Sequence, residues 1–149
     1  MAHRFPEIVA YGSAFRFALE AEEACADFAA AADALAPAAF HATLEELTCA
    51  HRDRVEKLTM IRQEVNEMIL EPISALHQSD YLGSLDEEPA TSWPAILEQL
   101  IAAEQDTARY HEQFVAVASD VLAASARAFV RAARQDRQAA EELRGMLAV

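Results

Sequence analysis

Glycine and proline are scarce in this chain, which contains 3 Gly and 5 Pro among its 149 residues. These two residues interrupt helices most strongly, whereas alanine, the best helix former, is the dominant apolar residue here. Segments that alternate apolar and polar residues, as half-buried strands do, are also missing. We therefore expect an all-α protein, and its length suits a single domain spanning residues 1–149.

Cysteine is rare as well, with only Cys25 and Cys49 and no Cys-x-x-Cys pair. This excludes a zinc ribbon and a disulfide-stapled scaffold, and we expect both cysteines to be buried free thiols in Ala-rich helices. No apolar run reaches 18 residues, and the first 15 residues lack the continuous apolar stretch of a signal peptide. We expect a cytoplasmic protein that does not interact with membranes.

Positive charge is in short supply, since 12 Lys and Arg face 25 Asp and Glu and give a formal net charge of −13. A chain of this charge repels nucleic acid and anionic lipid, so neither is expected as a partner. Hydrophobic residues still make up 53% of the chain, which is the composition of a folded globular protein.

Apolar residues recur at intervals of three and four over four segments, the pattern of amphipathic helices. The predicted helices span about 14–35, from 37 to at least 66, about 94–118, and from just after Asp120 to near Leu147. Ser13 is the expected N-cap of the first helix, Thr91 or Ser92 that of the third, and Pro37 suits the first turn of the second. Together they form two helical hairpins, about 14–66 and 94–147.

A long connection, about 71–94, joins the hairpins and contains most of the turn signals of the chain. We expect it to include a short helix near residues 73–76. It has more apolar residues than a solvated loop needs, which predicts packing on the helices or on a second subunit. These residues are Ile73, Leu76, Tyr81, Leu85 and Trp93.

The two hairpins resemble each other, because Glu22 precedes Phe28 by the same spacing as Glu104 precedes Tyr110. The helical register also places several polar residues on or beside the apolar stripes, namely Glu22, His51, Arg54, Glu104 and Asp136. A buried unpaired charge is costly, so these groups must be neutralised by one another, by water or by a metal. The histidines without such a pattern are expected at the surface: His41, His77 and His111.

Four segments resemble the helices of the rubrerythrin-type branch of the ferritin-like superfamily. They are ALEAEEACADFAAAA, LEELTCAHRDRVEKL, LIAAEQDTARYHEQF and FVRAARQDRQAAEEL, and the resemblance covers about 14–66 and 94–147. It implies an antiparallel four-helix bundle around a di-iron site, with a Glu from helices one and three and Glu-x-x-His from helices two and four. Glu22 and Glu104 fit the first pattern. His51 to Arg54 and Asp136 to Ala139 depart from the second.

Two classes of function follow from this partial match, and enzymatic activity stays open. In the first, Glu22, His51, Glu104 and Asp136 bind one divalent ion (iron, zinc or manganese) for iron handling or for peroxide or oxygen chemistry. In the second, Arg54 pairs with the buried carboxylates in place of the metal, and the bundle is a structural or protein-interaction module. The resemblance also implies a homodimer or a larger homo-oligomer.

Overall fold

The computed structural model describes residues 3–148, and the regular secondary structure over that range consists of helices, with no strand. Its α-helices are α1 (Tyr11–Leu35), α2 (His41–Glu64), α3 (Leu82–Leu85), α4 (Trp93–Ala118) and α5 (Ala123–Leu147). Short 3₁₀ turns lie at Ala38–Phe40, Asn66–Met68 and Gln78–Asp80. Within the described part of the chain, none of the helices combines the length and the apolarity needed to cross a membrane.

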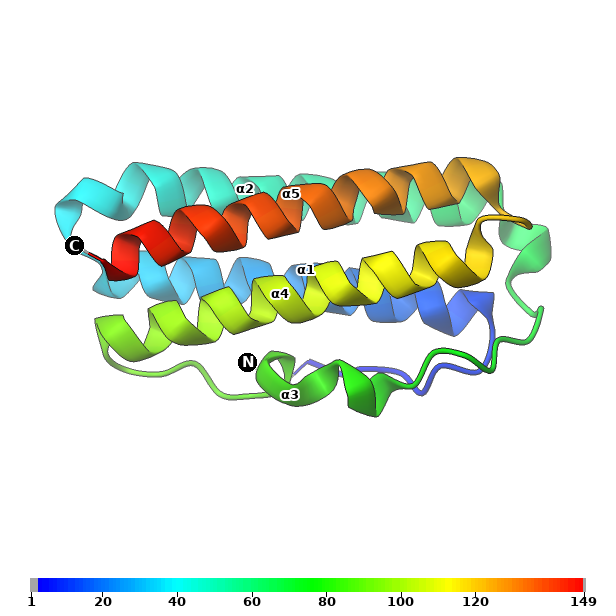
Figure 1. Cartoon of the computed structure of the whole chain (residues 1–149), viewed down its shortest axis with the longest axis horizontal. Coiled ribbons are helices and arrows are strands. Elements are labelled where there is room, and N and C mark those ends of the chain that lie inside the picture. The colour runs from blue at the N-terminus through cyan, green and yellow to red at the C-terminus, as the bar shows by residue number, and fades with distance from the viewer. Residues whose placement is uncertain (1–2, 149) are drawn as a thin grey trace.

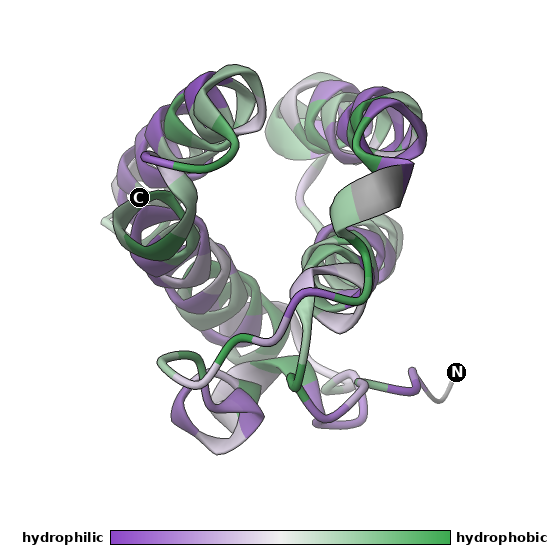
Figure 2. Ribbon diagram, turned by 90° about the vertical axis from the view of Figure 1, so that its right-hand side faces the viewer, coloured by the Kyte–Doolittle hydropathy of each residue, from purple (hydrophilic) through white to green (hydrophobic). Residues whose placement is uncertain are grey.

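The four long helices lie side by side, and α3 lies across one flank of them (Figure 1). α1 packs against both α2 and α4, and α4 packs against α5. Viewed along the helices, the four surround a common interior (Figure 2). All four long helices can therefore direct side chains to one central point.

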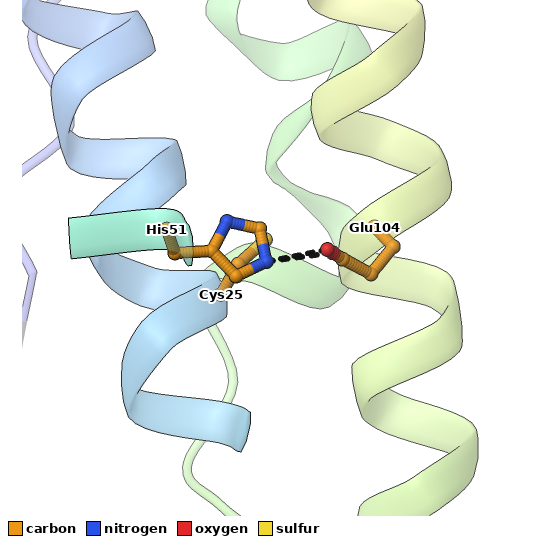
Figure 3. A group of neighbouring side chains, drawn as sticks. All are labelled: Cys25, His51 and Glu104. Atoms are coloured by element: carbon orange, nitrogen blue, oxygen red, sulfur yellow. Dashed lines mark hydrogen bonds and ion pairs between the residues drawn. The ribbon is translucent and has the colours of Figure 1, made fainter. Parts of the chain in front are cut away.

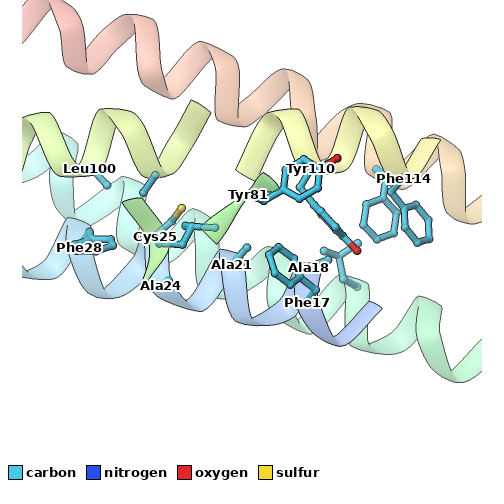
Figure 4. Close-up of a cluster of buried hydrophobic side chains, with 14 of the residues drawn as sticks. Phe17, Ala18, Ala21, Ala24, Cys25, Phe28, Tyr81, Leu100, Tyr110 and Phe114 are labelled. Carbon is cyan, nitrogen blue, oxygen red and sulfur yellow. The ribbon is translucent and has the colours of Figure 1, made fainter. Parts of the chain in front are cut away.

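Small and aromatic residues fill the core between α1 and α4 (Figure 4). The rings of Phe17 and Tyr110 lie 4.6 Å apart, and the Tyr110 hydroxyl donates a hydrogen bond of 2.6 Å to the carbonyl of Ala14. Alanines on α1 let α4 approach closely, and the aromatic rings fill the space beyond them. This core fixes the position of α1 relative to α4.

The start of α1 differs from the prediction. The helix begins at Tyr11, so Ser13 is not its N-cap, and the Ser13 hydroxyl instead accepts hydrogen bonds from the backbone N–H groups of Val9 and Ala10. An earlier start is possible because Gly12 allows a close approach to Ile69. A Cβ atom on Gly12 would lie 2.5 Å from Ile69 Cγ2, and the Gly12 N–H donates to the Ile69 carbonyl at 2.9 Å.

Two other terminal positions agree with the prediction only in part. Pro37 lies before the Ala38–Phe40 turn, so α2 begins at His41 rather than at the proline. Ser92 is the N-cap residue of α4, but its side chain makes no capping hydrogen bond. Helix ends depend on a few local contacts, and the sequence pattern alone leaves them uncertain by a few residues.

The connection between α2 and α4 packs on the long helices of its own chain, as one of the two alternatives predicted. Ile73, Leu76, Tyr81 and Leu85 are all buried. The short helix expected near residues 73–76 is absent, and the ordered turns are instead Gln78–Asp80 and α3. The prediction was wrong there because Ile73 and Leu76, although three residues apart as on one helix face, are buried from a segment that is not helical.

Truncating the connection should reveal how much it stabilises the fold. Leu76 is 1% exposed, so Leu76→Ala is expected to lower the free energy of unfolding by about 2–5 kcal/mol. Leu70 lies in the same connection and is 88% exposed, so Leu70→Ala should change stability by less than about 0.5 kcal/mol. Urea unfolding followed by circular dichroism measures both. Equal effects of the two variants would refute the packing described.

Candidate functional site

Six ionisable side chains from all four long helices meet in the interior and are here named the central charge cluster. They are Glu22 from α1, His51 and Arg54 from α2, Glu104 and His111 from α4, and Asp136 from α5. Five of them are fully buried, and Arg54 is 8% exposed. So many buried charges are stable only when they are paired and hydrogen-bonded.

Arg54 links helices that lie on different sides of the cluster. Its Nε donates to Glu22 Oε1 at 2.8 Å, and its Nη2 donates to Asp136 Oδ1 at 2.8 Å. Its Nη1 donates to Gln135 Oε1 at 2.9 Å at the edge of the interior. The guanidinium fork therefore bonds to α1 and to α5 at once, which a single-point cation such as lysine does not do.

His51 connects two of the carboxylates. Its Nδ1 lies 2.7 Å from Glu22 Oε1, and its Nε2 lies 2.5 Å from Glu104 Oε1. Burial alone would lower the pKa of His51, but the Glu104 and Glu22 carboxylates outweigh it and raise this pKa to about 10. At neutral pH His51 is thus a cation that donates from both ring nitrogens.

His111 belongs to the same cluster, so its predicted place at the surface was wrong. It is fully buried, and its Nε2 lies 2.9 Å from Glu22 Oε2 and 3.4 Å from Asp136 Oδ2. Burial works to lower the pKa of His111, yet Asp136 and Glu22 raise it to about 9. A signal was present in the sequence, because His111 lies on the α4 stripe three residues before Phe114.

The carboxyl groups of Glu22 and Asp136 respond to this environment in opposite ways. Burial opposes ionisation of Glu22, but His51, His111 and Arg54 hold its pKa well below the usual value. For Asp136, burial and the nearby charge of Glu22 raise the pKa to about 8. Ionisation is therefore favoured at Glu22 and opposed at Asp136.

The structure brings together all four residues predicted as metal ligands, namely Glu22, His51, Glu104 and Asp136, with Arg54 among them. A dinuclear centre would need about six ligands. Here a permanent cation bonds to two of the candidate ligands. This donor set does not fit two metal ions, and binding of a single ion stays a prediction.

One half of the cluster contains sulfur (Figure 3). The candidate ligand atoms of Cys25, His51 and Glu104 all lie within 4.8 Å of one another, and all three residues are buried. Burial, followed by the nearby Glu104 and Glu22, raises the pKa of the Cys25 thiol well above its usual value. The expectation of two buried cysteines was wrong for Cys49, which is exposed on α2.

Two cavities lie along the surface between α2 and α5, and we name them together the α2–α5 groove. Their volumes are about 290 Å³ and about 270 Å³. Arg54 and Gln135 line both cavities and separate one from the other. The groove thus lies directly outside the central charge cluster, with Arg54 between them.

Comparison of the chain with protein-family models, with curated proteins and with solved structures finds no match in any of the three. The likeness to ferritin-like proteins therefore remains an interpretation of the sequence segments. What the protein does has to be argued from the geometry of the central charge cluster and of the α2–α5 groove.

Proposed function

We propose that the chain is a degenerate ferritin-like protein, an antiparallel four-helix bundle that acts as a structural or protein-interaction module. The observation that carries this proposal is the position of Arg54, which bonds to Glu22 and Asp136. A guanidinium neutralises these carboxylates without any bound ion. The chain itself thus supplies the positive charge that a second metal ion supplies in a dinuclear centre.

Displacing Arg54 with a metal ion would be unfavourable. An arginine keeps its proton at all relevant pH values, and its pairing with Glu22 and Asp136 raises its pKa further despite burial. A metal bound between those carboxylates would leave the guanidinium without its carboxylate partners in a largely buried place, where the neutral Gln135 amide oxygen is the acceptor that remains. The geometry therefore favours a charge cluster that holds four helices together over a two-metal oxidase.

Oxygen consumption tests this proposal directly. Ferrous iron added in air to the purified chain should be oxidised no faster than in buffer, because no pair of irons can be held side by side. An oxygen electrode measures the rate, with a heat-unfolded sample as control for non-specific binding. Rapid oxidation with two irons retained per chain would refute the module and support di-iron chemistry.

A second candidate function is supported by the convergence of Glu22, His51, Glu104 and Asp136. In this case the four residues bind one iron, zinc or manganese ion for iron handling or for peroxide or oxygen chemistry. Metal analysis of protein purified without chelator distinguishes the two candidates. Protein that carries no transition metal, and takes up neither Fe(II) nor Mn(II), would exclude this second function.

The partner that best fits the α2–α5 groove is a second copy of the chain. One end of the groove is lined by Glu46 and Glu142, and the other, which is basic on balance, by Lys57 and Arg131 together with Glu64. A two-fold axis perpendicular to the groove brings the acidic end of each copy onto the basic end of the other. Met60, an exposed apolar side chain at the basic end, would be covered in such a homodimer.

Charge reversal tests this homodimer. Arg131→Glu and Glu142→Arg should each weaken self-association at least about tenfold, because each creates two like-charge contacts across the two-fold axis. An equimolar mixture of the two variants should restore dimers, since both contacts then pair opposite charges. Sedimentation equilibrium measures all samples, with Arg137→Glu as control because Arg137 pairs with Glu112 of α4. A monomeric wild-type protein, or a mixture that stays monomeric, would refute the interface.

A further inference from the structure

Cys25 and Glu104 lie in the part of the central charge cluster away from Arg54, and His51 lies between the two parts, because Arg54 Nη2 is 3.0 Å from His51 Nδ1. The hydrogen bonds of Arg54 to carboxyl and amide oxygens go to Glu22, Gln135 and Asp136. The side chains of Cys25, His51 and Glu104 come from α1, α2 and α4 and point toward one another (Figure 3). A thiol, an imidazole and a carboxylate therefore face a common point inside the protein.

We propose that Cys25 Sγ, His51 Nε2 and a carboxylate oxygen of Glu104 form a mononuclear zinc site. Their candidate ligand atoms lie within 4.8 Å of one another, so small side-chain movements suffice to bring them to tetrahedral positions. The ligand set differs from the one predicted from the sequence, because Cys25 enters it and Glu22 and Asp136 do not. The inference goes beyond the proposed module, which needs no metal, and it differs from the second candidate function because Cys25 replaces Glu22 and Asp136 among the ligands.

The surroundings of His51 support this assignment. Glu22 accepts a hydrogen bond of 2.7 Å from His51 Nδ1, which directs Nε2 toward Glu104. Histidine ligands of zinc are commonly oriented in this way by a carboxylate bonded to the other ring nitrogen. Glu22 is thus a positioning residue, and it keeps this role while it also pairs with Arg54.

Charge is conserved when zinc enters. The ion brings two positive charges, while one proton leaves the Cys25 thiol and one leaves His51 Nε2, and both protons pass to the solvent. The net charge of the buried cluster is therefore unchanged, and Arg54 can remain bonded to Glu22 and Asp136. No oxidation or reduction takes place.

The donor set also selects the metal. A thiolate with an imidazole favours zinc over calcium or magnesium, which need a shell of oxygen ligands. The fourth position of a tetrahedral ion is left to water or to the hydroxyl of Thr107, which lies 3.3 Å from Cys25 Sγ. Because all three ligands are buried, the metal has to enter while the chain folds, as it does in other structural zinc sites.

Cobalt(II) is a suitable probe, since it takes the place of zinc and a cobalt–thiolate bond absorbs in the near ultraviolet. The full chain is unfolded with reductant and chelator, transferred to chelator-free buffer, and refolded with one equivalent of cobalt chloride. We expect one bound cobalt per chain with a thiolate-to-cobalt band. Cys25→Ser should lose the band, whereas Cys49→Ser, the matched control at the exposed cysteine, should keep it.

X-ray absorption of zinc-loaded wild-type protein is a second test that needs no variant. It therefore remains valid if Cys25→Ser does not fold. One sulfur ligand at about 2.3 Å from zinc is expected, with the other ligands nitrogen or oxygen. Failure to bind cobalt or zinc, or binding through nitrogen and oxygen alone, would overturn the proposal. A different result, the retention and rapid oxidation of two irons per chain, would refute the proposed module function.

Discussion

Arg54→Leu is expected to lower the free energy of unfolding by about 3–5 kcal/mol, the usual cost of breaking a buried ion pair from one side. The leucine would fill part of the space but would leave Glu22 and Asp136 without the donors that now lie 2.8 Å from each. Asp136 can respond by staying protonated, whereas Glu22 keeps only its histidine partners. Chemical unfolding at neutral pH, followed by circular dichroism, measures the loss.

Arg137→Leu is the matched control for this substitution. Arg137 also pairs with a carboxylate on another helix, at 2.8 Å and 2.7 Å from the oxygens of Glu112, but this pair is exposed to solvent. Exposed pairs contribute about 0–1 kcal/mol, so the loss in Arg137→Leu should be far smaller than in Arg54→Leu. If both variants lose the same small amount, Arg54 is not the residue that neutralises the buried carboxylates.

The four long helices could be predicted from the sequence because each has an apolar stripe that its neighbours must cover. The predicted end of the first helix at Leu35 and that of the third at Ala118 agree with α1 and α4. The start of α1 could not be predicted, because it depends on hydrogen bonds from Tyr11 and Gly12 to a connection more than 50 residues away. Local sequence carries little information about such contacts.

The central charge cluster could be predicted in part for the same reason. Glu22, His51 and Glu104 lie on apolar stripes, and the helical register alone places them in the interior. The burial of His111 could also have been predicted from its place on the α4 stripe, but it was missed because it belongs to no recognisable ligand pattern. Its partners, Glu22 of α1 and Asp136 of α5, require a three-dimensional arrangement that spacing along one helix does not specify.

The polar residues that were recognised also gave no unique pairing. The sequence predicted that Arg54 pairs with buried carboxylates but did not say which, and the structure joins it to Glu22 and to Asp136. His51 rather than Arg54 contacts Glu104. The partners differ because the side chains differ in length. The longer arginine extends to Asp136 on α5, while the imidazole of His51 lies between Glu22 on α1 and Glu104 on α4. The result is two parts of one cluster, one around Arg54 and one around Cys25, which His51 and Glu22 join.

Stability should fall as the pH rises from about 7 to about 10. The folded protein raises the pKa of His51 to about 10 and that of His111 to about 9, both above the value of 6.5 for an unperturbed histidine. Their stabilising contribution is therefore complete below about pH 6.5 and is lost as the pH rises through the folded-state values. The raised pKa of Asp136, about 8, acts in the same direction, because ionisation is opposed only in the folded state.

Unfolding free energies measured at intervals across this range should decrease by at least about 2 kcal/mol, after allowance for relaxation of the buried groups. His111→Gln removes one of the two buried histidines, so its stability at pH 7 should be lower and its alkaline decrease shallower than in the wild type. His41→Gln is the control, because His41 pairs with Asp33 in an exposed position and its loss should leave the alkaline decrease intact. A flat profile between pH 7 and 10 in the wild type would mean that the buried imidazoles are not held as cations, and the pairing of His51 with Glu22 and Glu104 would then need a neutral ring.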